Sequence, residues 1–344
     1  MDITAFDFHL PDNLIAQEPL AERDASRMLI VDRRAGAWRD SQFTEFPQQL
    51  SAGDVLVINN TRVFPARLRG RRLPFGGSVE LLLAREVKRN VWEALARPAR
   101  RLRLDDQIEF AGAGLRARVI DSLDQGIRVI EFETNENLDD VIDRIGEPPL
   151  PPYINRPGAV DSDRQRYQTV YATERGAIAA PTAGLHFTPE ILTKLRERGV
   201  RVEEITLHVG YGTFEPVRVA DISQHKVAAE RFSVSEPTAE KINQAKSNGR
   251  RILAVGTTTA RALESATSAG GEIKAQSGAA SLTIIPGYEF RMVDALLTNF
   301  HLPKSSLLML VSAFAGRELV LSAYQHAVEK SYRFYSYGDC MLVL

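Results

Sequence analysis

The sequence is poor in cysteine, which excludes several kinds of site. Cys340 is the single cysteine among 344 residues, so no disulfide can form within the chain. Thiolate zinc sites and cysteine-ligated iron–sulfur clusters need several cysteines and are excluded as well. No two of the six histidines lie three to five residues apart, so no His-xxx-His metal motif is present. We therefore predict no metal site.

Common catalytic and nucleotide-binding motifs are also missing. The sequence contains no GxGxxG dinucleotide fingerprint, no GxxxxGK[ST] phosphate loop and no GxSxG nucleophile elbow. A redox enzyme, an ordinary nucleotide hydrolase and a serine hydrolase are therefore not favoured. What chemistry the chain performs has to be sought in less common patterns.

Long hydrophobic runs and a basic N-terminal leader are lacking too. The first eleven residues hold two acidic residues and no lysine or arginine, unlike a secretory signal. The longest apolar stretch, around residues 307–314, is far shorter than the roughly 20 residues that span a bilayer. We expect a cytoplasmic protein that makes no membrane contact.

Charge is balanced over the chain but unevenly distributed along it. The formal net charge is −1, yet residues 62–103 hold twelve basic and three acidic side chains, a local charge of +9 against −10 for the rest. Such asymmetry is typical of a module that binds a polyanion. The alternative is a solvated face that tolerates arginine, and the sequence alone does not separate the two.

The chain length and the strand pattern predict two domains. Short strand-like segments separated by turn signals recur about every ten residues between residues 79 and 132, as in an antiparallel barrel. The proline-rich segment 148–152 predicts a stiff linker, after which strands and helices alternate. We predict an α/β fold in which a mixed-sheet main domain, residues 1–64 and 153–344, carries an inserted antiparallel β-barrel domain, residues 65–152. We expect this inserted domain to be basic, in contrast to an acidic body, and to be the polyanion-binding module.

Two glycine- or asparagine-containing turns follow apolar strands. Asn60 and Arg62 come at the carboxyl end of an apolar strand, where ligands bind in open α/β sheets. Gly256, followed by three threonines, joins another apolar strand to a helix and could bind a carboxylate or phosphate. The alternatives are a polar turn into the barrel and plain helix capping.

Two histidines lie in unusual surroundings. His186 follows a run of small residues that includes Thr182 and Gly184, and a helix begins directly after it. His208 ends a strand on the face opposite its apolar residues and precedes a Gly-Tyr-Gly loop. Each histidine could be catalytic, because histidine exchanges protons near neutral pH. Each could instead be structural or incidental.

Seven motifs in order give the chain a family resemblance. The motifs are RDASRML (23–29), GDVLVINNTRVFPARL (53–68), GAIAAPTAGLHFT (176–188), LHVGYGTFEPV (207–217), AVGTTTARALES (254–265), LLTNFHLPKSSLLMLVSAFAG (296–316) and YRFYSYGDCML (332–342). Together they resemble the S-adenosylmethionine:tRNA ribosyltransferase-isomerase family of queuosine biosynthesis. The middle of the barrel, about residues 73–135, has no distinctive match.

The resemblance implies a reaction. Members of this family move the ribosyl part of S-adenosylmethionine onto 7-aminomethyl-7-deazaguanine at the tRNA wobble position, giving epoxyqueuosine-tRNA, adenine and methionine. S-adenosylmethionine is then a consumed substrate, no cofactor is required, and the partner is the precursor-carrying tRNA. We expect a monomer. A non-catalytic RNA-binding protein and an S-adenosylmethionine enzyme that does not use RNA remain the alternatives.

The resemblance and the chemistry together suggest roles for particular residues. The expected acids and bases are His186, His208 and His301, in unassigned order. The expected substrate-binding residues are Asn60, Arg62, Thr182, Gly184, Gly256, Thr257, Thr258 and Thr259, with residues 256–259 placed at the methionine carboxylate. The expected tRNA-binding residues are Arg67, Arg69, Arg71, Arg72, Arg100, Arg101 and Arg103.

One segment departs from the family pattern. After His225 and Lys226 the family usually has a methionine and then a second histidine before a glutamate. This chain has Val227, Ala228 and Ala229 before Glu230. We interpret the segment as accessory, with His225 and Glu230 keeping what role it has.

Overall fold

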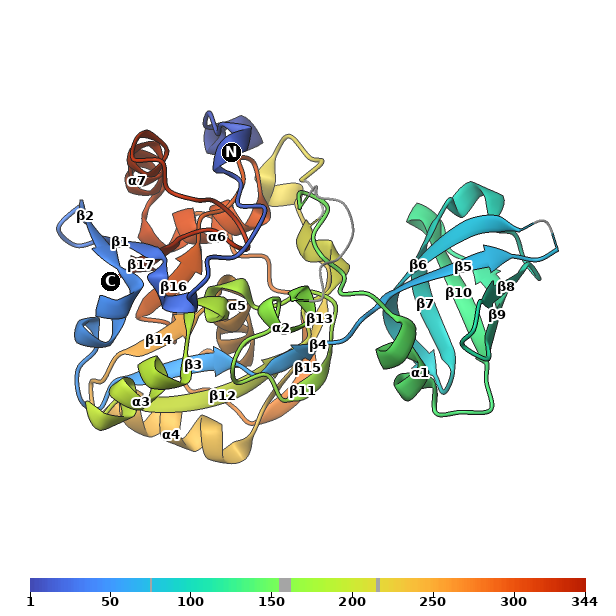
Figure 1. Ribbon diagram of the computed structural model, residues 1–344. Helices are drawn as coiled ribbons and strands as arrows, with labels where there is room; N and C mark the ends of the chain where they lie inside the picture. Colours follow the sequence, from blue (N-terminus) through green and yellow to red (C-terminus); the bar gives the residue numbers. More distant parts are fainter. Residues whose placement is uncertain (75, 155–161, 215–216) are drawn as a thin grey trace.

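A computed structural model describes residues 1–344 except 75, 155–161 and 215–216. Two parts are visible in Figure 1: a large α/β body and a smaller barrel joined to it by adjacent chain segments. The predicted fold class, a mixed-sheet domain with an inserted antiparallel β-barrel, is confirmed. Both the first and the last residues of the chain belong to the body.

Among the described residues, nine strands form one mixed sheet in the body, in the order β15-β13-β12-β3-β14-β16-β17-β1-β2. Their bounds are β1 Arg27–Asp32, β2 Ala37–Gln42, β3 Val55–Asn59, β12 Arg201–Leu207, β13 Glu230–Val234, β14 Ile252–Val255, β15 Gln276–Ala280, β16 Ala295–Asn299 and β17 Cys340–Val343. β12, β3, β14 and β16 run parallel, and β17 is antiparallel to β16. β17, near the end of the chain, is therefore an internal strand of the sheet, between β16 and β1.

Helices cover both faces of this sheet. Their bounds are α2 Asp163–Arg166, α3 Pro189–Glu197, α4 Glu236–Ser247, α5 Thr257–Ala266, α6 Ser306–Ala315 and α7 Arg317–Glu329. Alternate residues of β3 point to opposite faces: Val55 and Val57 belong to the core that also contains residues of α4 to α7, and Leu56 belongs to the core that contains residues of α3. Burial on both faces explains why the central strands are almost entirely apolar.

Local signals set the helix ends that matter for the site. Thr188 Oγ1 accepts a hydrogen bond from the N–H of Ile191 at 3.3 Å, and Pro189 occupies the first turn of α3, as the sequence predicts. Gly256 begins α5 with φ +92°, a conformation that favours glycine. α5 ends at Ala266.

The inserted barrel is closed in the order β10-β7-β6-β5-β8-β9. Its elements are β5 Arg67–Arg72, β6 Gly77–Lys88, β7 Val91–Arg97, β8 Gln107–Phe110, β9 Leu115–Ser122, β10 Ile127–Glu133 and α1 Leu138–Ile145. α1 packs Leu138, Val141 and Ile142 against the barrel core. A Cβ on Gly146 would lie 2.0 Å from the carbonyl oxygen of Pro65, so the entering and leaving chain segments run in contact.

Two short strands and several 3₁₀ helices complete the fold. β4 Thr61–Val63 pairs in parallel with β11 Glu174–Ala177. The 3₁₀ helices are η1 Ile3–Phe6, η2 Asp12–Leu14, η3 Arg23–Ala25, η4 Phe43–Gln49, η5 Ala99–Arg101, η6 Asp124–Gly126, η7 Thr182–His186, η8 Tyr211–Phe214 and η9 Ile222–Gln224. The small-residue run that the sequence singles out thus includes η7.

Candidate active site

A pocket lies in the body at the carboxyl ends of β14 and β16, the edge where α/β sheets bind ligands. It encloses about 520 Å³ of space, open to solvent at its mouth. The described residues that line it are Ala179, Ala180, Pro181, Thr182, Ala183, Val209, Gly256, Thr257, Thr258, Thr298, Asn299, His301, Leu307, Tyr335 and Ser336. This set contains no Asp, Glu, Lys or Arg, so the described part of its wall carries no formal charge at neutral pH.

The N-terminus of α5 forms one wall of the pocket. The N–H of Gly256 is already bonded to the carbonyl oxygen of Leu297 at 2.8 Å, and no side chain caps the helix. The next N–H groups, at Thr257 and Thr258, have no partner within a helix and carry its positive dipole end. Thr259 differs, because its hydroxyl donates to the carbonyl oxygen of Val255 at 2.6 Å. Its hydroxyl is therefore already used inside the body.

The end of β16 forms another part of the wall. His301 is 5% exposed, and its Nε2 lies 2.8 Å from the hydroxyl of Thr298. Thr298 in turn donates to the carbonyl oxygen of Asn299 at 3.3 Å. This arrangement favours a proton on Nε2 and a lone pair on Nδ1. Burial lowers the pKa of His301 to about 3, so the ring is neutral at pH 7.

Asn299 is a pocket residue that the sequence did not single out. Its Nδ2 lies 3.2 Å from Nε2 of His186 and 3.1 Å from the carbonyl oxygen of Tyr335, to which it donates. Its Oδ1 is buried and has no partner among the described residues. The sequence does contain a signal for this pocket residue. Thr298 and Asn299 are polar residues at the carboxyl end of an apolar strand, as Asn59 and Asn60 are at the end of β3.

His186 lies behind Asn299 and does not line the pocket. Its Nδ1 lies 2.8 Å from the hydroxyl of Ser26, and that hydroxyl donates to the carbonyl oxygen of Arg23 at 3.3 Å. Nδ1 therefore carries the proton, and Nε2 accepts a hydrogen bond from the amide N–H of Asn299. Burial, helped by the charges of Arg23 and Arg333, lowers the pKa of His186 to about 3. Both ring nitrogens are thus occupied by the protein itself.

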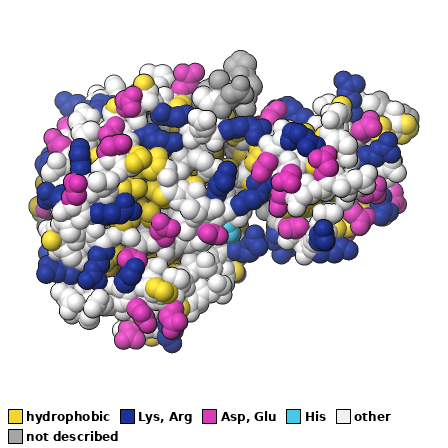
Figure 2. Space-filling view, turned by 60° about the horizontal axis from the view of Figure 1, so that its bottom comes forward, with side chains coloured by type: hydrophobic (Ala, Val, Ile, Leu, Met, Phe, Trp, Pro, Cys, Tyr) yellow, Lys and Arg dark blue, Asp and Glu magenta, His cyan; other side chains and the backbone are white. Residues whose placement is uncertain are grey.

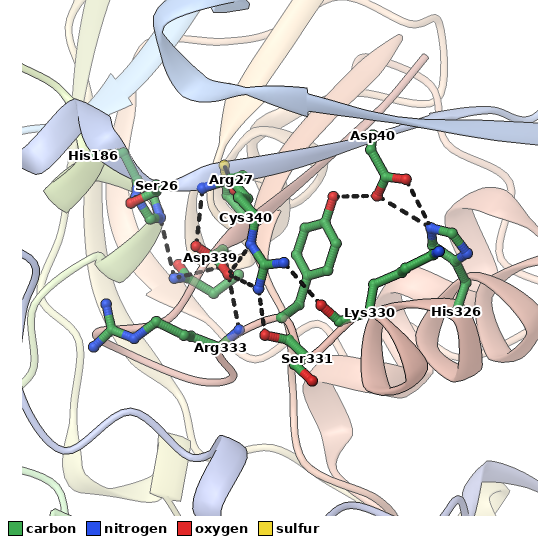
Figure 3. Close-up of polar contacts among 12 residues, drawn as sticks. Ser26, Arg27, Asp40, His186, His326, Lys330, Ser331, Arg333, Asp339 and Cys340 are labelled. Atoms are coloured by element: carbon green, nitrogen blue, oxygen red, sulfur yellow. Dashed lines mark hydrogen bonds and ion pairs between the residues drawn. The ribbon is translucent and has the colours of Figure 1, made fainter.

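An ion pair with a buried carboxylate fixes the segment that carries Tyr335 and Ser336. Asp339 accepts from the backbone N–H of Arg27 at 2.9 Å and from that of Arg333 at 2.8 Å, and the Arg27 guanidinium bonds to the same carboxylate at 3.2 Å. Figure 3 shows these contacts next to those of Ser26 and His186. The motifs around residues 23–29 and 332–342 therefore act as one support behind the pocket.

His208 lies outside the pocket, one residue before Val209, which lines it. Its Nδ1 is 2.8 Å from the hydroxyl of Thr61, and the ring covers Gly176, where a Cβ would come within 2.7 Å of it. Burial and the nearby charge of Arg231 lower the pKa of His208, against an opposing effect of Glu174. The structure thus brings His186 into contact with Asn299 and His301 into contact with Thr298, and it leaves His208 outside the pocket.

The remaining predicted substrate-binding residues are divided. Thr182 lines the pocket. Gly184 does not, and a Cβ there would lie 2.1 Å from the hydroxyl of Tyr171, so this glycine is required for packing. Asn60 uses both ends of its amide on β12, donating to Glu204 at 3.1 Å and accepting from Thr206 at 2.7 Å. Arg62 is exposed on β4, outside the pocket.

The segment that departs from the family pattern contributes a buried ion pair. Glu230 bonds to the guanidinium of Arg261 on α5, and its other oxygen accepts from the N–H of Gly210 at 2.8 Å. Burial raises the pKa of Glu230 even though Arg261 opposes the shift. The pair holds the loop after Val209 against α5. Nε2 of His225 is buried and has no hydrogen-bond partner among the described residues.

The predicted charge contrast between barrel and body is wrong. Residues 65–152 hold fifteen basic and fifteen acidic side chains, because the positive first half of the barrel is balanced by a negative second half. Figure 2 accordingly shows both signs interspersed on the face it presents. The excess of basic residues is local to part of the barrel. The arginines responsible for it lie on β5, β7, η5 and the loops beside them.

The predicted tRNA-binding arginines fall into two groups. Arg69 pairs with Glu80 at 3.5 Å and Glu147 at 3.1 Å, and Arg72 pairs with Asp106 at 3.4 Å. Arg67 donates to the carbonyl oxygen of Leu150 at 3.1 Å. Within the described part of the chain, the exposed guanidinium groups of four others form no ion pair. These four are Arg71, Arg100, Arg101 and Arg103.

A groove separates the barrel from the body and encloses about 1540 Å³ of space open to solvent. Its basic residues are Arg67, Arg69 and Arg97 of the barrel, and the proline-rich linker 148–152 forms one side. Ile178 and Tyr211 line the groove, whereas the nearby Ala179 and Val209 line the pocket. The groove and the pocket are therefore neighbours that share two segments of the body.

No single described helix is long and apolar enough to cross a membrane. α6 and α7 pass such a test only when taken together, and they meet at a bend of 116°. Among the residues that the structure describes, no group of three or more His, Cys, Asp or Glu side chains could hold a metal ion.

Comparison with known proteins identifies the family. The family model described as "Queuosine biosynthesis protein" matches residues 3–343. The S-adenosylmethionine:tRNA ribosyltransferase-isomerase of Desulforamulus reducens is 47% identical over 344 residues, with both chains fully covered. A crystal structure of S-adenosylmethionine tRNA ribosyltransferase from Thermotoga maritima is 35% identical, with a TM-score of 0.56 over 99% of this chain and 100% of that one. The chain therefore belongs to the queuosine biosynthesis family, as a transferase with S-adenosylmethionine:tRNA ribosyltransferase-isomerase activity.

Proposed function

We propose that the enzyme transfers and isomerises the ribosyl moiety of S-adenosylmethionine onto 7-aminomethyl-7-deazaguanine at the tRNA wobble position, giving epoxyqueuosine-tRNA, adenine and methionine. S-adenosylmethionine is consumed as a substrate, and no cofactor takes part. The observation that carries the proposal is the uncharged pocket at the ends of β14 and β16, whose wall contains both a helix N-terminus and His301.

The donor occupies this pocket with its carboxylate at the N-terminus of α5. Free N–H groups at Thr257 and Thr258 and the positive end of the helix dipole favour an anion there. The small residues 179–183 let the ligand approach the backbone closely. Since no carboxylate side chain stands among the described lining residues, the sulfonium keeps its full acidifying effect on the C5′ hydrogens of the donor.

His301 is the proposed base for the first step. Its Nδ1 carries the lone pair, faces no partner among the described residues, and is unprotonated at neutral pH because the pKa is about 3. Because so low a pKa makes the ring a weak base, this step depends on the sulfonium, which acidifies the C5′ hydrogens. Adenine then leaves with a proton, the neutral amine of the nucleobase attacks, and methionine departs as the epoxide closes. His208 is kept as a candidate for the later proton transfers, and His186 as a residue that positions Asn299.

The tRNA is held by the arginine-rich side of the barrel and by the groove next to it. Arg71, Arg100, Arg101 and Arg103 form no ion pair with any described residue and are available to phosphates, whereas Arg69 and Arg72 pair with acidic side chains of the inserted domain. Phosphate contacts position a nucleic acid without reading its sequence. The wobble base reaches the pocket from the groove along the shared segments near residues 178–179 and 209–211.

Adenine release from S-adenosylmethionine tests the proposal. We expect release only with tRNA that carries the deazaguanine precursor, and none with the same tRNA carrying guanine at that position. Binding of both tRNAs without any release would support a non-catalytic RNA-binding protein, and release without tRNA would support a small-molecule enzyme. We further propose that the enzyme is a cytoplasmic monomer, and light scattering at assay concentration tests the oligomeric state.

A further inference from the structure

The amide of Asn299 is held in one orientation. Its NH₂ group faces three acceptors: Nε2 of His186 at 3.2 Å and the carbonyl oxygens of Tyr335 and Asp339 at 3.1 and 3.5 Å. Turning the amide over would place its oxygen against all three acceptors. His186 stays an acceptor because its other nitrogen donates to Ser26, whose own hydrogen goes to a carbonyl oxygen. The orientation therefore follows from the chain of donors behind it.

This orientation leaves Oδ1 of Asn299 without a partner. The residue is 2% exposed, and it lines the pocket, yet its amide oxygen accepts no hydrogen bond from any described residue. Buried polar atoms almost always have a partner, so a buried oxygen kept free at a pocket wall indicates a ligand that donates to it. The ligand group must carry N–H or O–H bonds.

The composition of the pocket limits which donor group the ligand can carry. The described lining residues include no carboxylate, so a positively charged donor group finds neutral oxygens rather than a counter-ion. α5 is a helix of ten residues, and its N-terminus lines the same pocket, where it favours an anion. A site for an anion next to a neutral acceptor suits the two ends of an α-amino acid, whose carboxylate and ammonium groups share one carbon.

We propose that Oδ1 of Asn299 accepts a hydrogen bond from the α-ammonium group of the methionyl end of S-adenosylmethionine, while the carboxylate of that end binds at the N-terminus of α5. This inference rests on the proposed function, because it assigns the donor to this pocket. His186 is then a positioning residue, which acts on the donor through Asn299.

Three compounds test the proposal by calorimetric titration of the full-length enzyme. They are S-adenosylmethionine, its analogue without the α-amino group and its decarboxylated analogue, which keeps the amine. A hydrogen bond to a charged group contributes enough that its loss weakens binding by about 10- to 100-fold. The wild-type enzyme should bind the deamino analogue that much more weakly than S-adenosylmethionine.

Variants locate the effect. Asn299→Leu should weaken S-adenosylmethionine and the decarboxylated analogue by the same factor and leave the deamino analogue unchanged. His186→Gln should give a smaller loss with the same selectivity for the amine, a pattern that general destabilisation does not produce. His326→Gln, which changes a histidine bonded to Asp40 at 3.1 Å and outside the pocket, is the matched control and should bind all three compounds as the wild type does.

Two results would overturn the inference alone: equal binding of S-adenosylmethionine and the deamino analogue by the wild-type enzyme, or an Asn299→Leu variant that loses both equally. Leucine leaves the carbonyl oxygens of Tyr335 and Asp339 without a donor, so the wild-type comparison decides the matter if this variant does not fold. A wild-type enzyme that binds no S-adenosylmethionine would overturn the proposed function and the inference with it.

Discussion

The pocket and the barrel differ in how they present charge. The described pocket wall is neutral and offers helix N–H groups, an amide oxygen and an imidazole, whereas the barrel surface carries many ionic side chains. Dipoles that are held in place recognise a small ligand by position, while flexible arginines recognise a polyanion by charge. The difference indicates that the two substrates are bound by separate physical means and can be perturbed separately.

The two halves of the barrel sequence carry opposite charges. Residues 65–103 are strongly basic and residues 104–152 strongly acidic, yet barrel closure places β5 directly beside β8. Two arginines of the basic half meet acidic side chains of the other half: Arg72 pairs with Asp106 and Arg69 with Glu147. A run of charge along the sequence becomes a binding surface only where folding leaves it unpaired.

The largest effect is expected in the pocket. His301→Ala should lower turnover by about two to four orders of magnitude, the usual contribution of a general base. Single-turnover adenine release with saturating substrates measures it. Affinity for tRNA and its salt dependence should stay at the wild-type values, because the substitution is remote from the arginine side of the barrel. A larger loss for His208→Ala than for His301→Ala would mean that the base is not the histidine in the pocket.

Substitutions in the barrel should instead affect the binding of tRNA. Replacing Arg71, Arg100, Arg101 and Arg103 together by glutamine should weaken tRNA binding by about 10- to 100-fold and lower the slope of log affinity against log salt by up to about three or four. Filter binding between 50 and 300 mM salt measures both quantities.

A matched control uses arginines that already have partners. The double variant Arg72→Gln and Arg85→Gln removes guanidinium groups paired with Asp106 and Glu93, so the salt slope should change little. If the paired and the unpaired variants lose the same amount, the assignment of free arginines to phosphates is contradicted.

Acid should destabilise the body before the barrel. Below pH 6.5 an unfolded histidine takes up a proton, whereas His186 and His301, with pKa values of about 3, do not while the body is folded. The contribution of these two neutral rings to the free energy of unfolding is therefore complete above pH 6.5 and falls as the pH drops towards 3. Lowering the pH from 7 to 5 should reduce the free energy of unfolding by about 2 kcal/mol for each of these two histidines. Residues 65–152 contain no histidine.

Tryptophan fluorescence can follow the two regions separately, since Trp38 lies in the body and Trp92 in the barrel. Urea unfolding of Trp92→Phe reports the body, and that of Trp38→Phe reports the barrel. The midpoint of the body should fall more steeply with acid. Identical shifts in both variants, with coincident midpoints, would show that the two regions unfold as one unit and that the comparison cannot be made at the level of stability.

The smallest effect distinguishes two neighbouring threonines. Thr259→Val removes a buried hydroxyl bond to Val255 and should lower stability by about 1 kcal/mol without changing donor affinity. Thr258→Val should do the reverse, since Thr258 lines the pocket. Thermal unfolding and donor titration of both variants check this, and a Thr259 variant that binds the donor poorly would be the unexpected result.

Much of the fold could be predicted because its signals are local. The cap at Thr188 and Pro189, the apolar strand at 252–255 and the short strands of the barrel all lie within a few neighbouring residues. β1 and β16 were not predicted from the pattern, although both are strands of the central sheet. Their pairing with β17, at the end of the chain, depends on contacts between distant segments.

The site was less predictable for the same reason. The sequence places His186 near small residues, but its orientation depends on Ser26, 160 positions earlier, and on Asn299, 113 positions later. The role of Asn299 follows from which of its atoms are satisfied, which no pattern records. Whether Arg69 or Arg71 is free likewise depends on where Glu147 lies after the barrel closes.

The most direct test of the contrast between pocket and barrel is the salt dependence of both affinities in the wild-type enzyme. Equilibrium dissociation constants for S-adenosylmethionine and for precursor tRNA are measured over the same salt range. We expect the donor affinity to be nearly independent of salt and the tRNA affinity to fall steeply, with a log–log slope of several units. A donor affinity that falls as steeply as that of the tRNA, or a tRNA affinity that is flat, would contradict the account.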